Sequence, residues 1–212
     1  MQILAHRGLW NKNEEKNRLD VLKKALEKGY GIETDIRDYE GELVISHNIA
    51  EANSPKLESL LEYYHDIRCK EILALNVKSD GIQEKLTELL NKYSIHNYFL
   101  FDMSVPEMVV YRERKLAYYT RHSDIERECV LYGDSDGVWL DSFYDYSWLT
   151  EDDIMMHLND GKKVCLVSPE LHGRDYYEMW FMLKTTGLYL NDELQICTDK
   201  VEECKVYFYG EN

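Results

Sequence analysis

The chain is poor in the residues that would mark a disulfide framework, a zinc motif or a domain linker. Its five cysteines are odd in number and scattered, and they form no Cys-x-x-Cys pair. That pattern disfavours a disulfide framework, a zinc site and a cysteine nucleophile, and it predicts reduced thiols in a cytoplasmic protein. Only three of the 212 residues are proline, and no low-complexity segment interrupts the chain. We therefore expect a single domain over residues 1–212.

Long hydrophobic runs and an excess of positive charge are lacking as well. No stretch is long enough to span a bilayer, and because the first residues have no signal-peptide pattern, we expect no secretory signal. Forty acidic residues against twenty-five basic ones give a formal net charge of −15. Because such a surface repels phosphates, nucleic acid and anionic membranes are not expected as partners unless a local basic site or a metal intervenes. The charge also fits simple solubility, and it leaves the oligomeric state open.

Short apolar runs alternate with segments of helical periodicity along the whole chain. Eight principal strands are predicted, at Gln2–His6, Gly31–Arg37, Leu73–Val77, Tyr98–Phe101, Leu116–Thr120, Gly137–Leu140, Val164–Val167 and Leu194–Cys197. A further strand, Leu43–Ser46, is expected to form a hairpin with the second one through Glu40-Gly41. Eight strands alternating with eight helices predict a compact α/β fold, a (βα)8 TIM barrel. A doubly wound open sheet is the alternative, because periodicity alone does not show closure.

Local sequence signals indicate where several helices begin. Ser54-Pro55 predicts a helix start with proline at the first helical position. Ser104 and Ser123 are each followed three residues later by a glutamate, and this spacing predicts a capping box at both places. Thr150 precedes three acidic residues, which favour the positive end of a helix dipole.

Polar side chains gather at the carboxyl ends of the predicted strands, where a TIM barrel keeps its catalytic groups. Glu33 and Asp35 are two residues apart on one strand, so their side chains point the same way. Two carboxylates placed like this repel each other unless a cation or protons intervene. Mg²⁺ or Ca²⁺, which prefer oxygen ligands, would suit them. The alternative is a pair of solvated carboxylates at a strand end.

Two histidines and two basic side chains accompany these carboxylates in the sequence. His6 and His47 could flank a phosphodiester, one taking a proton from the attacking hydroxyl and the other giving a proton to the leaving oxygen. Arg7 and Lys78 could bind phosphate oxygens and stabilise the charge that develops at phosphorus. Alternatively, each histidine caps a strand or packs in the core, and each basic side chain pairs with a neighbouring carboxylate.

Five segments carry a resemblance to a known family: AHRG (Ala5–Gly8), ETDIR (Glu33–Arg37), LVISHN (Leu43–Asn48), LNVK (Leu75–Lys78) and the looser ICTDKVEECKVYF (Ile196–Phe208). In this order they resemble the glycerophosphodiester phosphodiesterase family, within the wider group of barrels that includes phosphatidylinositol-specific phospholipases C. The five segments, taken in this order, extend over nearly the whole chain. The first three segments together are fairly specific to the family.

The resemblance implies a phosphoric diester hydrolase that cleaves a glycerophosphodiester or a related small or lipid-derived phosphodiester. In the family reaction a neighbouring substrate hydroxyl attacks phosphorus, and the cyclic phosphate that forms is then hydrolysed. A divalent cation is implied, Mg²⁺ or Ca²⁺, with Mn²⁺ as a further option. By resemblance the roles fall to an acid/base pair, two phosphate contacts and three metal ligands: His6 and His47, Arg7 and Lys78, and Glu33, Asp35 and Asn76.

The chain departs from the family pattern in three places. Asn76 stands where the family usually has an acidic ligand, so it offers an amide oxygen without the charge. The family usually has a His-Asp pair, and here that pair is His47-Asn48, with asparagine in place of the aspartate. Only 28 residues separate His47 from Asn76, which leaves no room for the usual insertion subdomain. Asn76 and Asn48 keep open a barrel that binds a phosphorylated ligand without cleaving it. A third possibility is an unrelated barrel enzyme that uses Asp102, Asp141 and Glu170.

Overall fold

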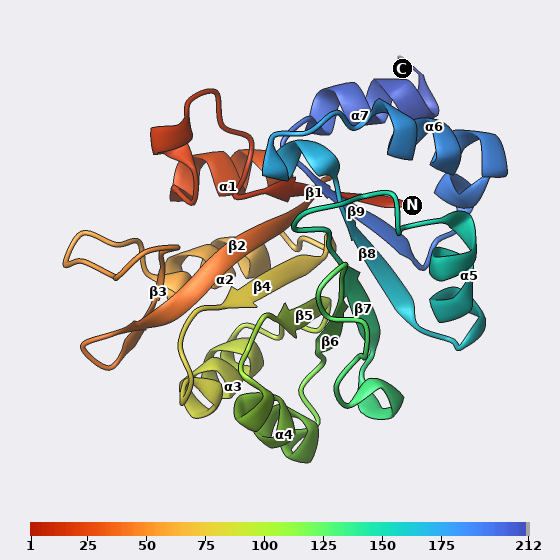
Figure 1. Ribbon diagram of the computed structural model, residues 1–212. Helices are drawn as coiled ribbons and strands as arrows, with labels where there is room; N and C mark the ends of the chain where they lie inside the picture. The colour runs from red at the N-terminus through yellow and green to blue at the C-terminus, as the bar shows by residue number, and fades with distance from the viewer. Residues whose placement is uncertain (211–212) are drawn as a thin grey trace. The chain divides into compact units, whose positions relative to one another are not determined.

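The computed structural model describes residues 1–210, and it has the α/β fold class that the sequence predicts (Figure 1). The strands are β1 (Gln2–His6), β2 (Gly31–Tyr39), β3 (Glu42–Ile45), β4 (Leu73–Val77), β5 (Tyr98–Phe101), β6 (Tyr119–His122), β7 (Gly137–Leu140), β8 (Lys163–Val167) and β9 (Leu194–Thr198). The α-helices are α1 (Leu19–Glu27), α2 (Leu57–Asp66), α3 (Gln83–Lys92), α4 (Val105–Arg114), α5 (Glu151–Asn159), α6 (Tyr177–Thr186) and α7 (Val201–Tyr209). The principal strands follow the order β5-β4-β2-β1-β9-β8-β7-β6, and β3 pairs with β2 outside this path. This strand order, with helices after most strands, is that of a compact (βα)8 barrel.

The chain divides into two compact units, and each is described by itself. The first unit is Ala5–Tyr118, which holds the end of β1, strands β2 to β5 and helices α1 to α4. In it β2 pairs in parallel with β4, and β4 with β5. The second unit joins Met1–Leu4 to the segment from Tyr119 onward. In it β6, β7, β8 and β9 pair in parallel in chain order.

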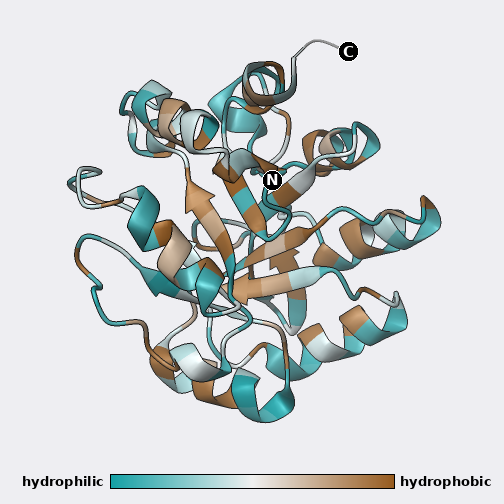
Figure 2. Cartoon of the chain, turned by 90° about the vertical axis from the view of Figure 1, so that its right-hand side faces the viewer, coloured by the Kyte–Doolittle hydropathy of each residue, from teal (hydrophilic) through white to brown (hydrophobic). Residues whose placement is uncertain are grey.

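The strands are buried because their apolar runs are nearly continuous. All five residues of β4 are buried, and so are all five of β9, as parallel strands covered by helices require. Helix α1 instead buries a single face through Val21, Leu22, Ala25 and Leu26, which is the spacing of an amphipathic helix. Figure 2 shows the contrast, since the strands are largely brown whereas the helices carry both brown and teal residues.

Most predicted strands are confirmed to within a few residues. The expected hairpin is present, because Tyr39 pairs with Glu42 in an antiparallel register. Glu40 and Gly41 between them both have positive φ, 49° and 82°, as a type I′ turn requires. The largest strand error is at β6, which begins at Tyr119 rather than Leu116. Leu116 does not pair with a neighbouring strand, because its backbone N–H donates to the carbonyl of Tyr111 near the end of α4.

The predicted helix starts at Ser104 and Thr150 are confirmed, since each side chain accepts a hydrogen bond from the amide three residues on. Helix α2 begins at Leu57, two residues later than Pro55, which is predicted to start it. The reason is a long-range bond: the Pro55 carbonyl accepts from the amide of Ile45 at 2.7 Å. That bond holds the backbone of Pro55 against the β3 hairpin.

The prediction of a helix after Ser123 is wrong, because no α-helix forms there, and the described residues hold seven α-helices rather than eight. The Ser123 hydroxyl does accept from the amides of Ile125 and Glu126. The Glu126 carboxylate, however, pairs with Arg121 instead of reaching back to cap the turn. The Asp124 carboxylate meanwhile accepts from three amides of a distant loop, those of Phe143, Tyr144 and Asp145. These contacts hold residues 123–131 as a loop.

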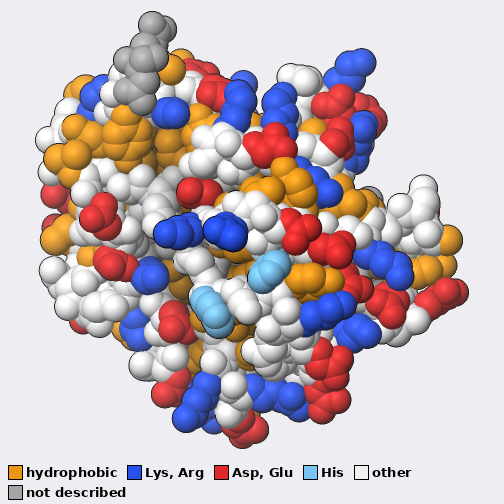
Figure 3. All heavy atoms as spheres, turned by 180° about the vertical axis from the view of Figure 1, so that it is seen from behind, with side chains coloured by type: hydrophobic (Ala, Val, Ile, Leu, Met, Phe, Trp, Pro, Cys, Tyr) orange, Lys and Arg blue, Asp and Glu red, His pale blue; other side chains and the backbone are white. Residues whose placement is uncertain are grey.

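Surface and composition follow the sequence in other respects. All five cysteines are free thiols, as predicted. On the face seen in Figure 3, acidic and basic side chains are interspersed. None of the helices among residues 1–210 has both the length and the apolar character that crossing a membrane would take.

Candidate active site

The three predicted metal ligands lie side by side on two neighbouring strands of the first unit. In the parallel register of β2 and β4, Asp35 is the direct partner of Asn76, and Glu33 lies two residues before Asp35 on the same face of β2. All three side chains are buried, with exposed fractions of 2% for Glu33, 0% for Asp35 and 6% for Asn76. The structure therefore brings these residues together, and it excludes the alternative of two solvated carboxylates.

A strained turn after β1 carries the predicted phosphate contact. Arg7 and Gly8 both have positive φ, 58° and 95°, and the Arg7 amide donates to the carbonyl of Glu33 at 2.9 Å. A Cβ added to Gly8 would lie 2.8 Å from the backbone and side chain of Val21, so only glycine fits against helix α1. Strain of this kind is commonly kept at functional sites. Here it turns the Arg7 side chain toward Asp35.

Three groups converge on the buried carboxylate of Asp35. Arg7 Nε lies 2.8 Å from Oδ2, and Lys78 Nζ lies 3.3 Å from Oδ1. Asn17 Nδ2 also donates to Oδ2 at 2.7 Å, while Asn17 Oδ1 accepts from the hydroxyl of Thr34 at 2.8 Å. The two basic side chains keep a partly exposed edge, 19% for Arg7 and 22% for Lys78. They can thus hold Asp35 and still meet a phosphate.

Asn17 is a site residue that sequence reasoning missed. It lies in the loop before α1, with φ of 64°, and its backbone N–H donates to the backbone carbonyl of Arg7 at 3.0 Å. It is buried, at 8% exposure. No motif marks it, because its partners Arg7, Thr34 and Asp35 are distant in sequence.

The residues present fit a hard divalent cation. Within the part of the chain that the structure describes, seven buried polar side-chain atoms have no hydrogen-bond partner, and three of them are Glu33 Oε2, Asp35 Oδ1 and Asn76 Oδ1. Asp35 Oδ1 has only the ion pair with Lys78 at 3.3 Å. These three oxygens belong to the predicted ligands, and an all-oxygen set suits Mg²⁺ or Ca²⁺. Leaving such atoms unpaired in a protein interior is costly, so an ion there would satisfy all three.

Asp102 supplies a further carboxylate beside this set. It follows β5, and its Oδ2 accepts from Asn76 Nδ2 at 3.1 Å. That hydrogen bond orients the amide so that the Asn76 oxygen stays open. The sequence pattern places Asp102 at a strand end but does not connect it with Asn76. Its negative charge offsets the acidic group that the chain lacks at position 76.

Crowding changes the protonation of Glu33. Burial, followed by the charge of Asp35, raises the pKa of Glu33 to about 8, although Arg7 and Lys78 oppose the shift. Glu33 is therefore largely protonated at neutral pH when no cation is bound, and a binding cation would displace that proton. The imidazole of His6 lies beside it, with Nε2 at 3.9 Å from Glu33 Oε2.

The second predicted histidine, His47, is exposed in the loop after β3. Its Nδ1 lies 3.0 Å from Asn48 Oδ1, so the pair that replaces His-Asp still makes a contact. Arg37 bridges this loop to β4, because it donates to the carbonyls of Asn48 and Lys78. The bridge ties the loop that carries His47 to the strand end that carries Lys78.

A hollow of about 380 Å³ joins His47 to the phosphate side of the site. Arg7 and His47 both line it, together with the basic side chains of Lys16 and Arg18. His6 does not line it, and its Nε2 lies 3.9 Å from Glu33 Oε2. Three cations around one hollow create a local positive site on a protein whose net charge is strongly negative, as anion binding requires.

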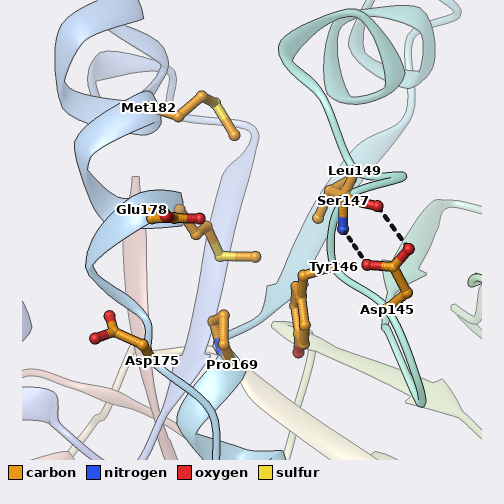
Figure 4. Close-up of a pocket in the computed structure, with 9 residues that line it drawn as sticks. Asp145, Tyr146, Ser147, Leu149, Pro169, Asp175, Glu178 and Met182 are labelled. Atoms are coloured by element: carbon orange, nitrogen blue, oxygen red, sulfur yellow. Dashed lines mark hydrogen bonds between the residues drawn. The ribbon is translucent and has the colours of Figure 1, made fainter.

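A hollow in the second unit has the opposite character. It has a volume of about 370 Å³ and is lined by Asp145, Asp175 and Glu178, with Met179 and Met182 beside them. Figure 4 shows Glu178 and Met182 on α6, across from the segment in which Asp145 holds Ser147 by two hydrogen bonds. Among the described residues, no lysine, arginine or histidine lines it, so it does not suit a phosphate.

Two carboxylates that the sequence offered for a different enzyme hold loops in the second unit. Asp141 Oδ1 lies 2.8 Å from His172 Nε2 and accepts from the amide of Ser142. Glu170 accepts from the hydroxyls of Ser168 and Thr198. Asp141 Oδ1 and both carboxylate oxygens of Glu170 are thus engaged in local structure.

Fold and site together define a (βα)8 barrel in which buried carboxylates, two basic side chains and a histidine meet at the ends of β1, β2 and β4. Three solved structures that are similar to the chain share this fold and are glycerophosphodiester phosphodiesterases. One, from Agrobacterium tumefaciens str. C58, has a TM-score of 0.66 and 15% identity, over 94% of this chain and 96% of its own.

Two further glycerophosphodiester phosphodiesterase structures come from Parabacteroides distasonis ATCC 8503. The first has a TM-score of 0.66 and 17% identity, covering 98% of this chain and 96% of its own. The second has a TM-score of 0.69 and 13% identity, covering 97% and 85%. At these identities the likeness establishes the shared fold. No protein-family model matches the sequence, and no curated protein matches it significantly.

Proposed function

We propose that the chain is a metal-dependent phosphodiesterase that hydrolyses a glycerophosphodiester or a related small or lipid-derived phosphodiester. One observation carries the proposal: the buried side chains of Glu33, Asp35 and Asn76 lie on the paired strands β2 and β4, while Arg7 and Lys78 hold the same Asp35. An oxygen cradle for a cation beside two basic groups is the arrangement that phosphoryl chemistry uses. The fold shared with three phosphodiesterases supports it.

Each residue has a role in this proposal. Glu33, Asp35 and Asn76 would hold Mg²⁺, Ca²⁺ or Mn²⁺, and a bound cation would supply positive charge against the phosphate. Arg7 and Lys78 bind phosphate oxygens and stabilise the developing charge. His6 and His47 move the protons, one from the attacking hydroxyl and one to the leaving oxygen.

The direct test is turnover with a panel of phosphodiesters. Purified protein is incubated with glycerophosphodiesters, lysophospholipids and bis-p-nitrophenyl phosphate in the presence of Mg²⁺, Ca²⁺ or Mn²⁺. We expect cleavage of at least one compound, and we expect chelation by EDTA to remove it. Failure of the whole panel with all three metals contradicts the proposal.

The histidine roles have their own test. His6→Ala and His47→Ala should each lower kcat by about 10²–10⁴-fold, because that is what general acid–base catalysis typically contributes. His96→Ala is the matched control, since His96 is an exposed histidine of the same unit. Circular dichroism verifies the fold of all three variants. Near-normal turnover in His6→Ala or His47→Ala rules out that histidine as acid or base.

A second candidate is a barrel that binds a phosphorylated ligand without cleaving it. Asn76 favours it, because the ligand set has an amide in place of a carboxylate and the high pKa of Glu33 lowers cation affinity further. Calorimetric titration that detects binding of a glycerophosphodiester, with no product after long incubation, would select this function over the first.

We further propose that residues 1–212 act as one catalytic domain, and that the protein works in the cytoplasm without nucleic acid as a partner. The five free thiols support a reducing compartment. The net charge of −15 opposes nucleic acid.

A further inference from the structure

A group of nitrogen and sulfur ligands lies in the second unit, whereas the candidate active site lies wholly in the first. His122 ends β6, Cys129 lies in the loop that follows, and His157 lies on α5. One ligand atom from each of the three lies within 4.8 Å of the other two. His122 and His157 are buried, and Cys129 is half-buried. The loop fold described above, in place of the expected helix, sets Cys129 beside the two histidines.

Hydrogen bonds around His157 indicate which of its ring nitrogens is free for a ligand bond. Tyr132 Oη donates to Asp160 Oδ2 at 2.9 Å, and it lies 2.9 Å from His157 Nδ1. Because the tyrosine proton goes to the carboxylate, Nδ1 of His157 donates to Tyr132 and Nε2 carries the lone pair. That lone pair faces His122, since Nε2 lies 2.9 Å from His122 Nδ1.

The contact between the two imidazoles is close to the spacing that a metal needs. Bond lengths of about 2.0–2.1 Å to nitrogen and about 2.3 Å to sulfur place tetrahedral ligand atoms roughly 3.4–3.6 Å apart. The His122 and His157 nitrogens therefore need to separate by only about half an ångström. His122 would also move its ring proton from Nδ1 to Nε2. A hollow of about 250 Å³ adjoins the group and is lined by all three residues.

The three side chains are shielded from bulk water. Burial lowers the pKa of both His122 and His157. Burial raises the pKa of the Cys129 thiol to about 11, so metal binding would release its proton. The charged groups that act on the cluster are Arg127, which opposes a cation, and three carboxylates that favour one, those of Glu126, Asp153 and Asp160.

We propose that His122, Cys129 and His157 bind a Zn²⁺-class ion, with the fourth coordination position open to the adjoining hollow. Two imidazoles and a thiolate select zinc over Mg²⁺ or Ca²⁺, which prefer oxygen ligands. The chain from His157 through Tyr132 to Asp160 orients the ligating imidazole, as outer partners do in zinc sites. The proposal is independent of the phosphodiesterase function, since the two sites share no residue.

Cobalt titration tests the site without reference to turnover. Co²⁺ is added to the full chain in buffer with excess Mg²⁺, which occupies oxygen sites. We expect one equivalent of Co²⁺ to give the near-ultraviolet charge-transfer absorption of a cobalt–thiolate bond. The band should persist in Cys69→Ser and disappear in Cys129→Ser, because Cys69 is also half-buried but lies in the other unit. Absence of the band in the unaltered protein, or its persistence in Cys129→Ser, overturns the proposal.

Zinc affinity gives a second measurement in case a variant disturbs the fold. By competition with a chromophoric chelator, Tyr132→Phe should bind Zn²⁺ about 10–100-fold more weakly, which is the usual cost of a lost outer partner. Cys129→Ser should lose more than that, and Cys69→Ser nothing. The site would also be refuted if Tyr132→Phe and Cys129→Ser, each with the native circular dichroism spectrum, bound Zn²⁺ as tightly as the unaltered protein.

Discussion

Replacing Asp35 by Asn tests whether the buried carboxylate organises the first unit as well as the candidate active site. The substitution keeps the volume but removes the charge that Arg7 approaches at 2.8 Å and Lys78 at 3.3 Å. The single amide oxygen of the new side chain can face either Arg7 and Asn17 or Lys78, so its NH₂ group meets a donor on the other side. Breaking a buried ion pair costs about 3–5 kcal/mol. Because Arg7 and Lys78 are partly exposed, solvent screens some of that loss, and we expect about 2–3 kcal/mol.

The assay for Asp35→Asn is equilibrium unfolding in urea at pH 7, with Asp38→Asn as the matched control. Asp38 lies on the same strand but is exposed, so its replacement should change the free energy of unfolding by less than about 0.5 kcal/mol. In the proposed enzyme, Asp35→Asn should in addition abolish turnover and cation binding. A loss of stability below about 1 kcal/mol would refute the reasoning, because it would mean that solvent screens the three contacts almost fully.

Three further predictions concern other parts of the molecule. Gly8→Ala should destabilise the fold by about 2–4 kcal/mol, because its φ is positive and the new methyl group would clash with Val21. Gly41→Ala is the control, since Gly41 has a similar φ but open space around it, and it should lose only the smaller free energy that comes from backbone strain. Equal losses of stability in urea unfolding would contradict the steric argument. The contribution of His157 to the stability of the metal-free protein should be complete above pH 6.5 and fall by about 3 kcal/mol as the pH drops toward 4, because the unfolded chain takes up a proton at an imidazole whose folded-state pKa is lowered to about 4. The raised pKa of Glu33 acts in the opposite direction over this range, so urea unfolding at pH 7 and 4.5 compares His157→Gln with the unaltered protein. Between these pH values His157→Gln should change in stability by about 2–3 kcal/mol more favourably than the unaltered protein, and an equal change in both would exclude a contribution from His157. Lys78→Met should lower kcat/KM for a phosphodiester by about 10²–10³-fold. Lys85→Met, a half-buried control on α3 that pairs with Glu42, should leave it unchanged, and similar kinetics in both would remove Lys78 from the phosphate site.

Local patterns account for how much of the fold could be predicted. Strand and helix periods of 2 and 3.6 residues depend on neighbours in the chain, so the predicted bounds of β4 and β7 match the observed ones. The same alternation along β2 is enough to place Glu33 and Asp35 on one face of the strand. Signals that local sequence shares with loops are less reliable, and the turn at Ser123 looks like a capping box but begins no helix.

By itself, then, the sequence determined the barrel class, the strand ends that carry polar groups and a set of seven candidate site residues. Only the tertiary structure decided what those groups touch. The register of β2 against β4 pairs Asp35 with Asn76, and loop paths bring Asn17 to Asp35 and Cys129 to His122 and His157. These contacts join residues far apart in the chain, and their formation depends on packing and long-range hydrogen bonds, which no local pattern encodes.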